Sequence, residues 1–581
     1  MPSSPFNGAC FSAKSWGWVQ FFRYPMVVAT LLLFLYSGNK AVAESTKDTA
    51  KQTDNSTAQT TNTASSVPSD KELVAEHATV GKITFHVGDI FNLSNPKENK
   101  YFYRLANRLH IDTKEFVIRN NLLFKTGDPY NPELLRESER ILRAKDYLFD
   151  AEIRPVRYHD NEVDVAVYTR DVWTLTGGVN YSHKGDQSEY GFEIQEDNFA
   201  GLGKSVEIKR DTNALRTQNE FKYQDPFIGR NRFQLTLGYS YNSDGHGKTF
   251  IFQRPFYSLE TKWAMNMVAT TSTQQSVIYQ NGSVAEQYSQ DNEYYELSGG
   301  LSRGFINNHT GRWQLGYTAF KNQFSANDAT VNPLMVPQNR ELSYPWISYN
   351  SIESRYIKTR RINLIGRTED INLGNVYNVN LGWSRKDLNS DLNALIYSAG
   401  YSTANNSFTH HLVLFNIGSS GRVGEGFTQN MLVSGQARYF YPVFKNQVFY
   451  AELQFAAGHN LDTDNQLLLG GDSGLRGYPA NIQDGNRRLL FRMEQRYYTN
   501  LQILQLVYVA GAAFFDIGKA WTPGIQADKY SGYLKDVGLG LRLSPSRTSH
   551  GTVTHLDLAY ALDSEEGLKK MQFLISTEKQ F

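Results

Sequence analysis

The sequence predicts an all-β barrel that spans a membrane, preceded by a small α+β domain. From residue 172 to 581, segments of alternating polarity recur about every 20 to 25 residues, between clusters of Gly, Asn and Asp. An apolar run near the N-terminus is typical of an export signal, and no later run reaches the roughly 18 apolar residues of a transmembrane helix. An exported chain of this kind can cross a membrane only as a closed barrel.

Residues 1–43 are expected to be a signal peptide. Lys14 and Arg23 supply positive charge, Met26 to Tyr36 is apolar, and Ala41-Val42-Ala43 offers a small-x-small cleavage site. As a helix, the apolar run would rise only about 16 Å, roughly half of a bilayer core. A cleaved signal is therefore favoured over a membrane anchor.

The composition and the chemical motifs argue against an enzyme. The net charge of +1 gives no electrostatic case for nucleic acid, and the only cysteine, Cys10, lies in the expected signal. Gly471-Asp472-Ser473-Gly474 resembles the nucleophile motif of trypsin-like proteases but lacks the following Gly-Pro and evident His and Asp partners. His410 and His411 would point to opposite faces of a strand, so no metal site is predicted, and no cofactor is expected.

Two segments precede the expected barrel. Residues 44–80 are rich in Ser and Thr and are predicted to be a disordered linker. Residues 81–171 show the pattern of a small mixed domain, in which Asn131 and Pro132 mark the start of a helix. The expected elements are a strand at 83–87, two helices within 100–118 broken near 112, a turn at 127–131, a helix at 132–148, and strands at 151–156 and 162–169 joined by a turn at 160–161.

Residues 172–581 are expected to form the barrel. In the segment 449–458, Phe449, Leu453 and Phe455 share one face, and Glu452 lies on the other. Strands that are apolar outside and polar inside, with many aromatics, are typical of outer-membrane barrels. The C-terminal strand carries the pattern Phe573, Ile575 and Phe581, which also favours a membrane over a soluble β-sandwich.

A glycine-rich loop with one arginine is the most informative motif. Leu475-Arg476-Gly477-Tyr478 follows a Gly-rich turn, and two later strand-like segments place Glu494 and Asp516 on their polar faces. A guanidinium taken out of bulk water needs paired charge and hydrogen bonds. We therefore predict that Arg476 reaches into the barrel lumen and contacts one or both acids.

The region from about residue 81 to the end resembles the BamA/TamA superfamily of bacterial outer-membrane proteins. Residues 124–131 resemble a turn of its POTRA domains, and Leu475 to Tyr478 resembles its (V/I)-R-G-(F/Y) loop, with Leu in the first place. Phe514 to Gly518 matches its F-x-D-x-G strand. The segment that contains Asn198, Gly201 and Gly203 resembles one short turn of the family. The segment that contains Asp225 and Pro226 resembles a later one.

This resemblance implies a single POTRA domain in the periplasm and a 16-stranded barrel in the outer membrane. About 410 residues suffice for 16 strands at about 25 residues each, although length alone would also admit 18. The expected function is an assembly or translocation factor that captures clients through the POTRA domain. The clients would leave through a lateral seam between the first barrel strand, near 174–183, and the last, near 571–581.

The expected partners are membrane lipid and an unfolded outer-membrane or exported polypeptide. Whether the client is a polypeptide or a lipid is left open, as is a periplasmic accessory protein. Two alternatives remain at this stage. One is a passive pore or surface-exposed structural protein, and the other is a secretion pore for one dedicated partner. A folded POTRA domain argues against the passive pore, since a channel needs no peptide-binding module.

Overall fold

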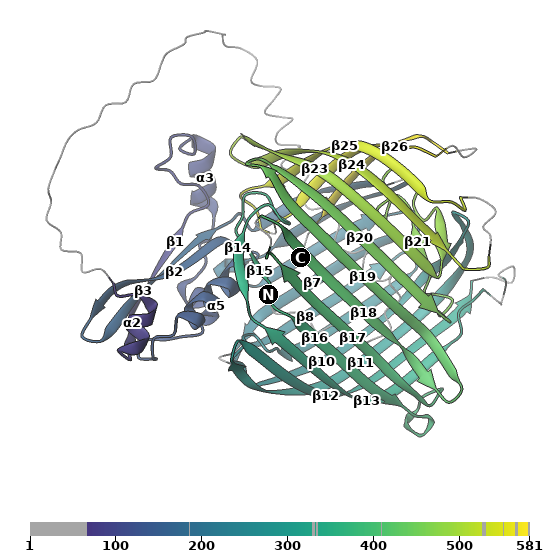
Figure 1. Cartoon of the computed structure of the whole chain (residues 1–581), viewed down its shortest axis with the longest axis horizontal. Coiled ribbons are helices and arrows are strands. Elements are labelled where there is room, and N and C mark those ends of the chain that lie inside the picture. The colour runs from purple at the N-terminus through teal and green to yellow at the C-terminus, as the bar shows by residue number, and fades with distance from the viewer. Residues whose placement is uncertain are drawn as a thin grey trace, which may run out of the picture.

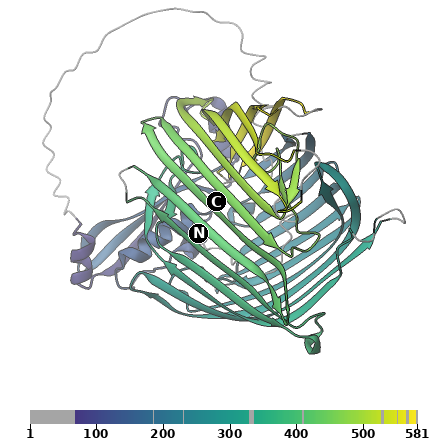
Figure 2. The same cartoon turned by 45° about the vertical axis from the view of Figure 1, so that its right-hand side comes forward.

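In a computed structural model, the described residues are 67–578 except 185, 230, 328–331, 333–334, 408–409, 526–529, 550 and 564–567. The predicted signal peptide, most of the predicted linker and Phe581 lie outside them. Figure 1 shows a small N-terminal domain beside one end of a large barrel, and Figure 2 shows the barrel obliquely. We call the end next to this domain the near end and the opposite end the far end.

The N-terminal domain is a three-stranded sheet covered by helices. Its order is β1-β3-β2, with β1 (Thr79–Gly88) parallel to β3 (Glu162–Asp171) and β2 (Leu148–His159) antiparallel to it. Its helices are α2 (Asp70–Ala75), α3 (Tyr101–Leu109), α4 (Glu115–Asn121) and α5 (Pro132–Arg143). Its core includes the fully buried side chains of Leu73, Val117, Ile118, Leu142, Leu148, Val163 and Val165.

Local sequence signals set these elements. The Asn131 side chain accepts from the Glu133 N–H at 2.9 Å and caps α5, and Asp160 and Asn161 form the two-residue turn with φ of 47° and 62°. The break near residue 112 separates α3 from α4 as predicted. However, α2 and the start of β1 lie in the segment assigned to the linker. That assignment is wrong there, because Ser69 and Glu72 form a capping box that starts a helix.

The barrel has 20 strands, so the predicted count of 16 is wrong. The strands are β4 (Leu175–Lys184), β5 (Gln187–Glu196), β6 (Ser205–Thr212), β7 (Thr217–Ile228), β8 (Phe233–Asn242), β9 (Gly245–Arg254), β10 (Trp263–Gln280), β11 (Ser283–Ile306), β12 (His309–Ala326), β13 (Arg340–Glu353), β16 (Val376–Ser384), β17 (Ala394–Asn405), β18 (Leu412–Gly424), β19 (Phe427–Phe444), β20 (Gln447–His459), β23 (Arg487–Ile503), β24 (Val507–Trp521), β25 (Leu534–Pro545), β26 (Val553–Ala561) and β27 (Met571–Glu578).

Short connections explain the higher strand count. Asn281 and Gly282 alone join β10 to β11, and Asn307 and Asn308 alone join β11 to β12, all with positive φ. Two-residue turns let each strand with its connection use only about 20 residues. Four short strands lie outside the wall and pair as β14 (Tyr356–Thr359) with β15 (Glu369–Asn372) and β21 (Leu467–Leu469) with β22 (Gln483–Gly485). Two single-turn helices, η1 (Phe199–Gly201) and η2 (Lys386–Leu388), occupy connections.

The wall alternates between an apolar outer face and a polar lumen. On β25, Leu539 and Leu541 are exposed outward, whereas Asp536 and Arg542 are buried on the inner face. This is the arrangement of a barrel surrounded by lipid. Within the described residues, no helix has the length and apolar character needed to cross a membrane.

The barrel closes between β27 and β4 through a narrow seam. Among the described residues, only Ile575 and His183 are registered as partners there, and the Ser182 hydroxyl approaches the Ile575 carbonyl at 3.5 Å. By contrast, β27 pairs with β26 from Met571 to Glu578, along its whole length. Over the described residues, the seam is thus held by far fewer backbone hydrogen bonds than the neighbouring strand pair.

Candidate functional site

Residues 470–478 fold inward from the far end of the barrel. The Leu475 N–H donates to the Gly470 carbonyl at 3.0 Å, and Gly474 adopts a φ of 121°, which only glycine takes easily. Leu475 and Tyr478 are fully buried against leucines of β21, β23 and β25. The Tyr478 hydroxyl also donates to the Asp563 carboxylate at 2.6 Å. These contacts hold Arg476 in the lumen.

Arg476 contacts both acids that the sequence analysis paired with it. Its Nε and Nη2 donate to the two oxygens of Asp516, each at 2.7 Å, and its Nη1 donates to Glu494 Oε1 at 2.6 Å. Its guanidinium also lies 3.5 Å from the centre of the Phe514 ring. A bidentate carboxylate pair with a ring face beneath it fixes the arginine in one geometry.

Three further charged residues complete this cluster. Arg496 Nε donates to Glu494 Oε2 at 2.8 Å, Arg542 donates to Glu494 and Asp557, and Asp557 Oδ2 lies 3.4 Å from Arg476 Nη1. We call the six residues the clasp: Arg476, Glu494, Arg496, Asp516, Arg542 and Asp557. Its three cations and three anions balance, as side chains removed from water require.

The sequence reasoning missed Asp557, Arg496 and Arg542. The alternation of their strands does place each on a lumen face, so a signal for inward orientation existed. Their convergence depends on the register of β23, β25 and β26, which no local pattern gives.

Two glycines of the matched motifs, Gly477 and Gly518, lie where neighbouring atoms leave little room for a side chain. A Cβ on Gly477 would lie 2.6 Å from the Cβ of Asp536, a fully buried acid that stands in register with Asp516. A Cβ on Gly518 would lie 3.0 Å from the Leu489 carbonyl and the Leu469 side chain. Both positions therefore need glycine so that the loop can press against the wall.

A second segment contacts the lumen wall at the near end. We call residues 354–375 the hairpin, which contains β14, β15 and the connecting loop 360–368. Arg438 Nη1 donates to Asn363 Oδ1 at 3.2 Å, and the Tyr498 hydroxyl donates to the Arg361 carbonyl at 3.3 Å. The tip of the hairpin therefore lies against the lumen wall.

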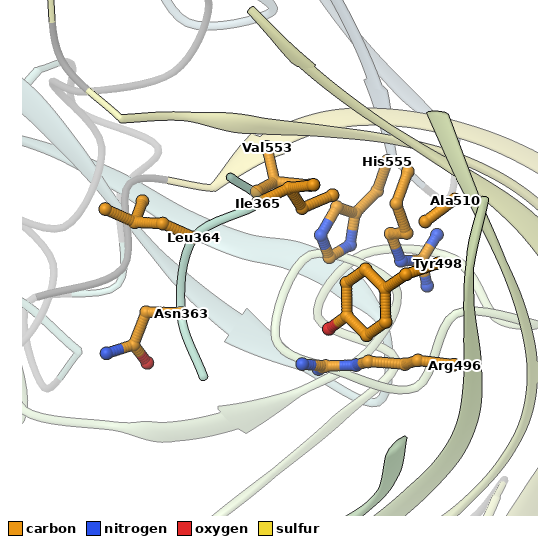
Figure 3. Close-up of a pocket in the computed structure, with 9 residues that line it drawn as sticks. Asn363, Leu364, Ile365, Arg496, Tyr498, Ala510, Val553 and His555 are labelled. Carbon is orange, nitrogen blue, oxygen red and sulfur yellow. The ribbon is translucent and has the colours of Figure 1, made fainter. Parts of the chain in front are cut away.

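The hairpin and the clasp meet around a small cavity. Figure 3 shows Asn363, Leu364 and Ile365 on one side, facing Arg496, Tyr498 and His555 of the wall. The cavity of about 20 Å³ is the size of one water molecule. Its lining joins two clasp arginines, Arg496 and Arg542, to the hairpin tip.

The base of the hairpin is bound to the N-terminal domain. Arg143 of α5 donates to both oxygens of Asp370, at 2.8 and 2.7 Å, and Glu139 pairs with both Arg143 and Lys358. The Arg140 guanidinium lies 4.3 Å from the centre of the Tyr356 ring. Burial alone would raise the pKa of Glu139, but hydrogen bonds from Lys358 and Arg143 outweigh it and lower that pKa.

The turn at 197–203 is a second contact between domain and barrel. The Asn198 amide donates to the Thr113 hydroxyl at 2.8 Å and accepts from the Gly203 N–H at 2.7 Å. Gly201 and Gly203 have φ of 73° and 67°, and a Cβ on Gly201 would lie 2.4 Å from the Asp112 carbonyl oxygen. The predicted turn is thus present, and it receives the loop between α3 and α4.

Asp225 and Pro226 do not form the turn expected of them. They lie inside β7, where the register shifts between Asp225 and Ile228, and the chain turns only after this strand. Proline fits the shift because it has no N–H for the ladder. Asp225 accepts from the Phe227 N–H at 3.0 Å and pairs with Lys204 at 2.9 Å.

The C-terminal strand residues differ in position. Phe573 is exposed on the outer face of β27, whereas Ile575 is the seam partner of His183. The other predicted strand residue, Phe581, is outside the described range.

One group within the described residues has the composition of a cation site. The ligand atoms of His110, Asp112 and Asp171 lie within 4.8 Å of one another. However, His110 Nε2 is hydrogen-bonded to Asp171 Oδ2 at 2.9 Å, and the Thr113 N–H donates to the same oxygen at 2.8 Å. The group therefore acts as a hydrogen-bonded junction where the domain meets the barrel. His411 is hydrogen-bonded to the Tyr439 hydroxyl at 2.6 Å.

Comparisons with known proteins agree with this architecture. Residues 198–581 match the model of the Omp85 superfamily domain, and residues 110–170 match the POTRA model, described as a surface antigen variable number repeat. Comparison with curated proteins gives no match.

Comparison with solved structures gives matches that include BamA from Haemophilus ducreyi lacking POTRA domains 1–3. It is 12% identical, with a TM-score of 0.36, over 86% of this chain and 84% of that one. CdiB from Acinetobacter baumannii and CdiB from Escherichia coli are each 12% identical, with TM-scores of 0.43, over 86% of this chain and 73% and 76% of theirs.

Family membership follows from the sequence models alone. The barrel fold of this family indicates the bacterial outer membrane. Because the match to residues 198–581 covers well over half of the chain, the protein belongs to the Omp85 superfamily and carries a POTRA domain before its barrel.

Proposed function

We propose that this protein is an outer-membrane factor that receives clients in the periplasm and inserts or translocates them through its barrel. The seam between β4 and β27 carries this proposal. Within the described part of β4 and β27 it has one registered pair, Ile575 with His183, and there the wall can part at the lowest cost in hydrogen bonds. A parted seam offers unpaired strand edges, and a client strand entering lipid must satisfy its own backbone groups.

The two closures of the lumen favour this function over a passive pore. The clasp anchors a loop from the far end, and the hairpin tip is hydrogen-bonded to the lumen wall at the near end. In the proposed function these two segments close the lumen at rest, whereas a passive pore would need a continuous open path. The near end, with the POTRA domain, then faces the periplasm.

The edge of the POTRA sheet suggests how a client binds. Among the described strands, β2 pairs with β3 alone, so its other side is a sheet edge. Two backbone groups on that edge already have hydrogen-bond partners on α5. The Ile153 N–H donates to Glu139 at 3.1 Å, and Arg143 donates to the Ala151 carbonyl at 3.0 Å. An extended client added along β2 would compete for the same two side chains that hold the hairpin. Client binding and release of the hairpin would then be coupled.

Site-specific photo-crosslinking in cells tests the proposal. A photoreactive residue at Arg157, on β2, is expected to capture a polypeptide, and one at Tyr181, on the outer face of β4 next to the seam, should capture the same polypeptide. Leu297 on β11 is the matched control, because it is also apolar and exposed outward but lies far from the seam in strand order. Capture at Arg157 and from lumen positions, but not at Tyr181, would favour a secretion pore. Absence of any captured polypeptide at Arg157 would contradict the proposal.

A further inference from the structure

Helix α3 presents an apolar face that the POTRA fold does not cover. Tyr101, Leu105 and Leu109 are 65%, 36% and 63% exposed, and Ile111 just beyond the helix is also exposed. With 3.6 residues per turn, the three helical residues share one face. Singly exposed apolar residues are ordinary, but a contiguous stripe on one helix indicates a binding surface.

The opposite face of α3 is fixed to the protein. Tyr103 stacks on Phe91 with ring centres 4.6 Å apart, and the Asn107 side chain accepts from the Phe91 N–H at 3.0 Å and donates to its carbonyl at 2.8 Å. The orientation of the helix is therefore set, and its apolar stripe cannot rotate inward to be buried.

The position of α3 places this stripe at the rim of the barrel. The Tyr103 hydroxyl donates to the Leu504 carbonyl at 2.7 Å, in the turn between β23 and β24. Beyond the helix, the Lys114 N–H donates to the Gly201 carbonyl at 3.0 Å, in the turn between β5 and β6. Figure 1 shows α3 next to the rim from which β23 and β25 rise, away from α2.

Exposed apolar residues link these two turns to the outer surface of the barrel. Leu501 is exposed and continues the outward face of Tyr497 along β23, and Leu504 and Phe199 are exposed at the turns themselves. The outer faces of barrel strands are covered by lipid. The apolar stripe of α3 is thus continuous with the near-end border of the lipid-facing wall.

The charges on α3 match a membrane surface. The helix contains Arg104 and Arg108, both exposed, and no acidic residue. Arginines beside an aromatic and leucine face are the pattern of helices that lie in the interface between headgroups and acyl chains. An anionic lipid headgroup would pair with Arg104 and Arg108, while the acyl chains would cover the apolar stripe of α3.

We propose that α3 is an interfacial helix, which inserts Tyr101, Leu105 and Leu109 into the periplasmic leaflet of the outer membrane and binds anionic phospholipid through Arg104 and Arg108. This anchors the POTRA domain to the bilayer independently of the hairpin. The inference depends on the barrel spanning the membrane and not on any client.

Environment-sensitive fluorescence of the full-length protein tests this inference. With Cys10 replaced by Ala, single cysteines at Leu105 or Leu109 would carry an NBD probe, and the protein would be placed in nanodiscs of phosphatidylethanolamine and phosphatidylglycerol. We expect blue-shifted emission, loss of quenching by aqueous iodide, and quenching by lipids with a doxyl spin label. Val156→Cys is the matched control, since Val156 is an exposed apolar residue of the same domain on β2, and its probe should remain accessible to iodide.

Two outcomes would overturn the inference. Iodide quenching at Leu105 equal to that at Val156 would mean that the stripe faces water. Protection from both iodide and the spin-labelled lipids would mean that protein, such as a second copy or a client, covers it. The headgroup role is tested by replacing phosphatidylglycerol with phosphatidylcholine and by Arg104→Gln with Arg108→Gln. Each change should shift the Leu105 emission towards red, and unchanged emission would remove the anionic lipid from the proposal.

Discussion

The loop at 470–478 and the hairpin at 354–375 are the two closures of the lumen in the proposed function, and they are held differently. The loop is held by the clasp, in which Arg476, Glu494 and Asp516 are all less than one-tenth exposed. The hairpin is held to the POTRA domain by a mixed set, in which Arg143 is buried and Lys358 is 57% exposed. One closure ties the barrel to itself, and the other ties the barrel to the domain that would meet clients.

This difference indicates which closure moves. Removing one charged residue from a buried cluster leaves the remaining charges buried without a partner, which is strongly unfavourable. Exposed pairs contribute little, and water can replace them. The clasp is therefore expected to persist through the working cycle as a brace. The hairpin is expected to be the closure that a client displaces.

The largest effect is expected from Arg476→Ala. The change leaves Glu494 and Asp516 without their shared cation, at a cost of about 3–5 kcal/mol, less where water enters the lumen. We expect the loop to leave the lumen, with higher single-channel conductance in planar bilayers, while the barrel still inserts. Arg492→Ala is the matched control, because Arg492 lies on β23, the strand of Glu494, but pairs with Glu452 of the neighbouring strand β20.

A double-mutant cycle over Arg476 and Asp516 sharpens that result. Strong coupling is expected between Arg476→Ala and Asp516→Ala, because their bidentate contact is direct. If the effects of the two single substitutions simply add, and Arg476→Ala has the conductance of the wild type, then the clasp does not hold the loop.

A smaller effect is expected from Arg143→Ala at the hairpin. The change removes two hydrogen bonds to Asp370 and one partner of Glu139, at a cost of about 1–3 kcal/mol. Hydrogen exchange of β14 and β15 in the full-length protein should become faster. Arg136→Ala is the control, since Arg136 lies on the same helix but pairs with Glu133 and Asp70. Equal exchange in the two variants would contradict a role for Arg143 in holding the hairpin.

The two regions also differ in how far the sequence predicts them. The contact of Arg476 with Glu494 and Asp516 could be expected because a lone arginine on a Gly-rich loop needs acids, and strand alternation places both acids inward. The hairpin was not foreseen. Its strands of four residues each are too short to show a period, and its partners on α5 are more than 200 residues away in sequence.

The N-terminal domain and the strand count show the same contrast. The start of α5 and the turn at Asp160 and Asn161 depend on local residues, so they were predicted correctly. The number of barrel strands depends on how many alternating segments close the wall, and that number was taken from a family resemblance. The observed spacing of 20 to 25 residues already admitted 20 strands.

Acidification should loosen the hairpin. The pKa of Glu139 is lowered below its usual value of 4.5, so its pairing stabilises the folded state above that value and is lost as the pH falls through the folded pKa. Hydrogen exchange of β14 and β15, corrected for the intrinsic effect of pH, should therefore accelerate below about pH 4.5. Glu139→Gln should remove most of this dependence. A full dependence in that variant would assign it to another group.

The smallest effect is expected from Lys358→Ala. Lys358 is mostly exposed, and exposed ion pairs contribute about 0.2–1 kcal/mol. Glu139 keeps its bond from Arg143 in this variant, so the hairpin should stay in place and its exchange should change far less than in Arg143→Ala. If Lys358→Ala instead released the hairpin fully, and added salt did the same to the wild type, surface attraction would be the main force holding it. The buried Arg143–Asp370 pair would then be secondary, and the hairpin would respond to ionic strength before it responded to any client.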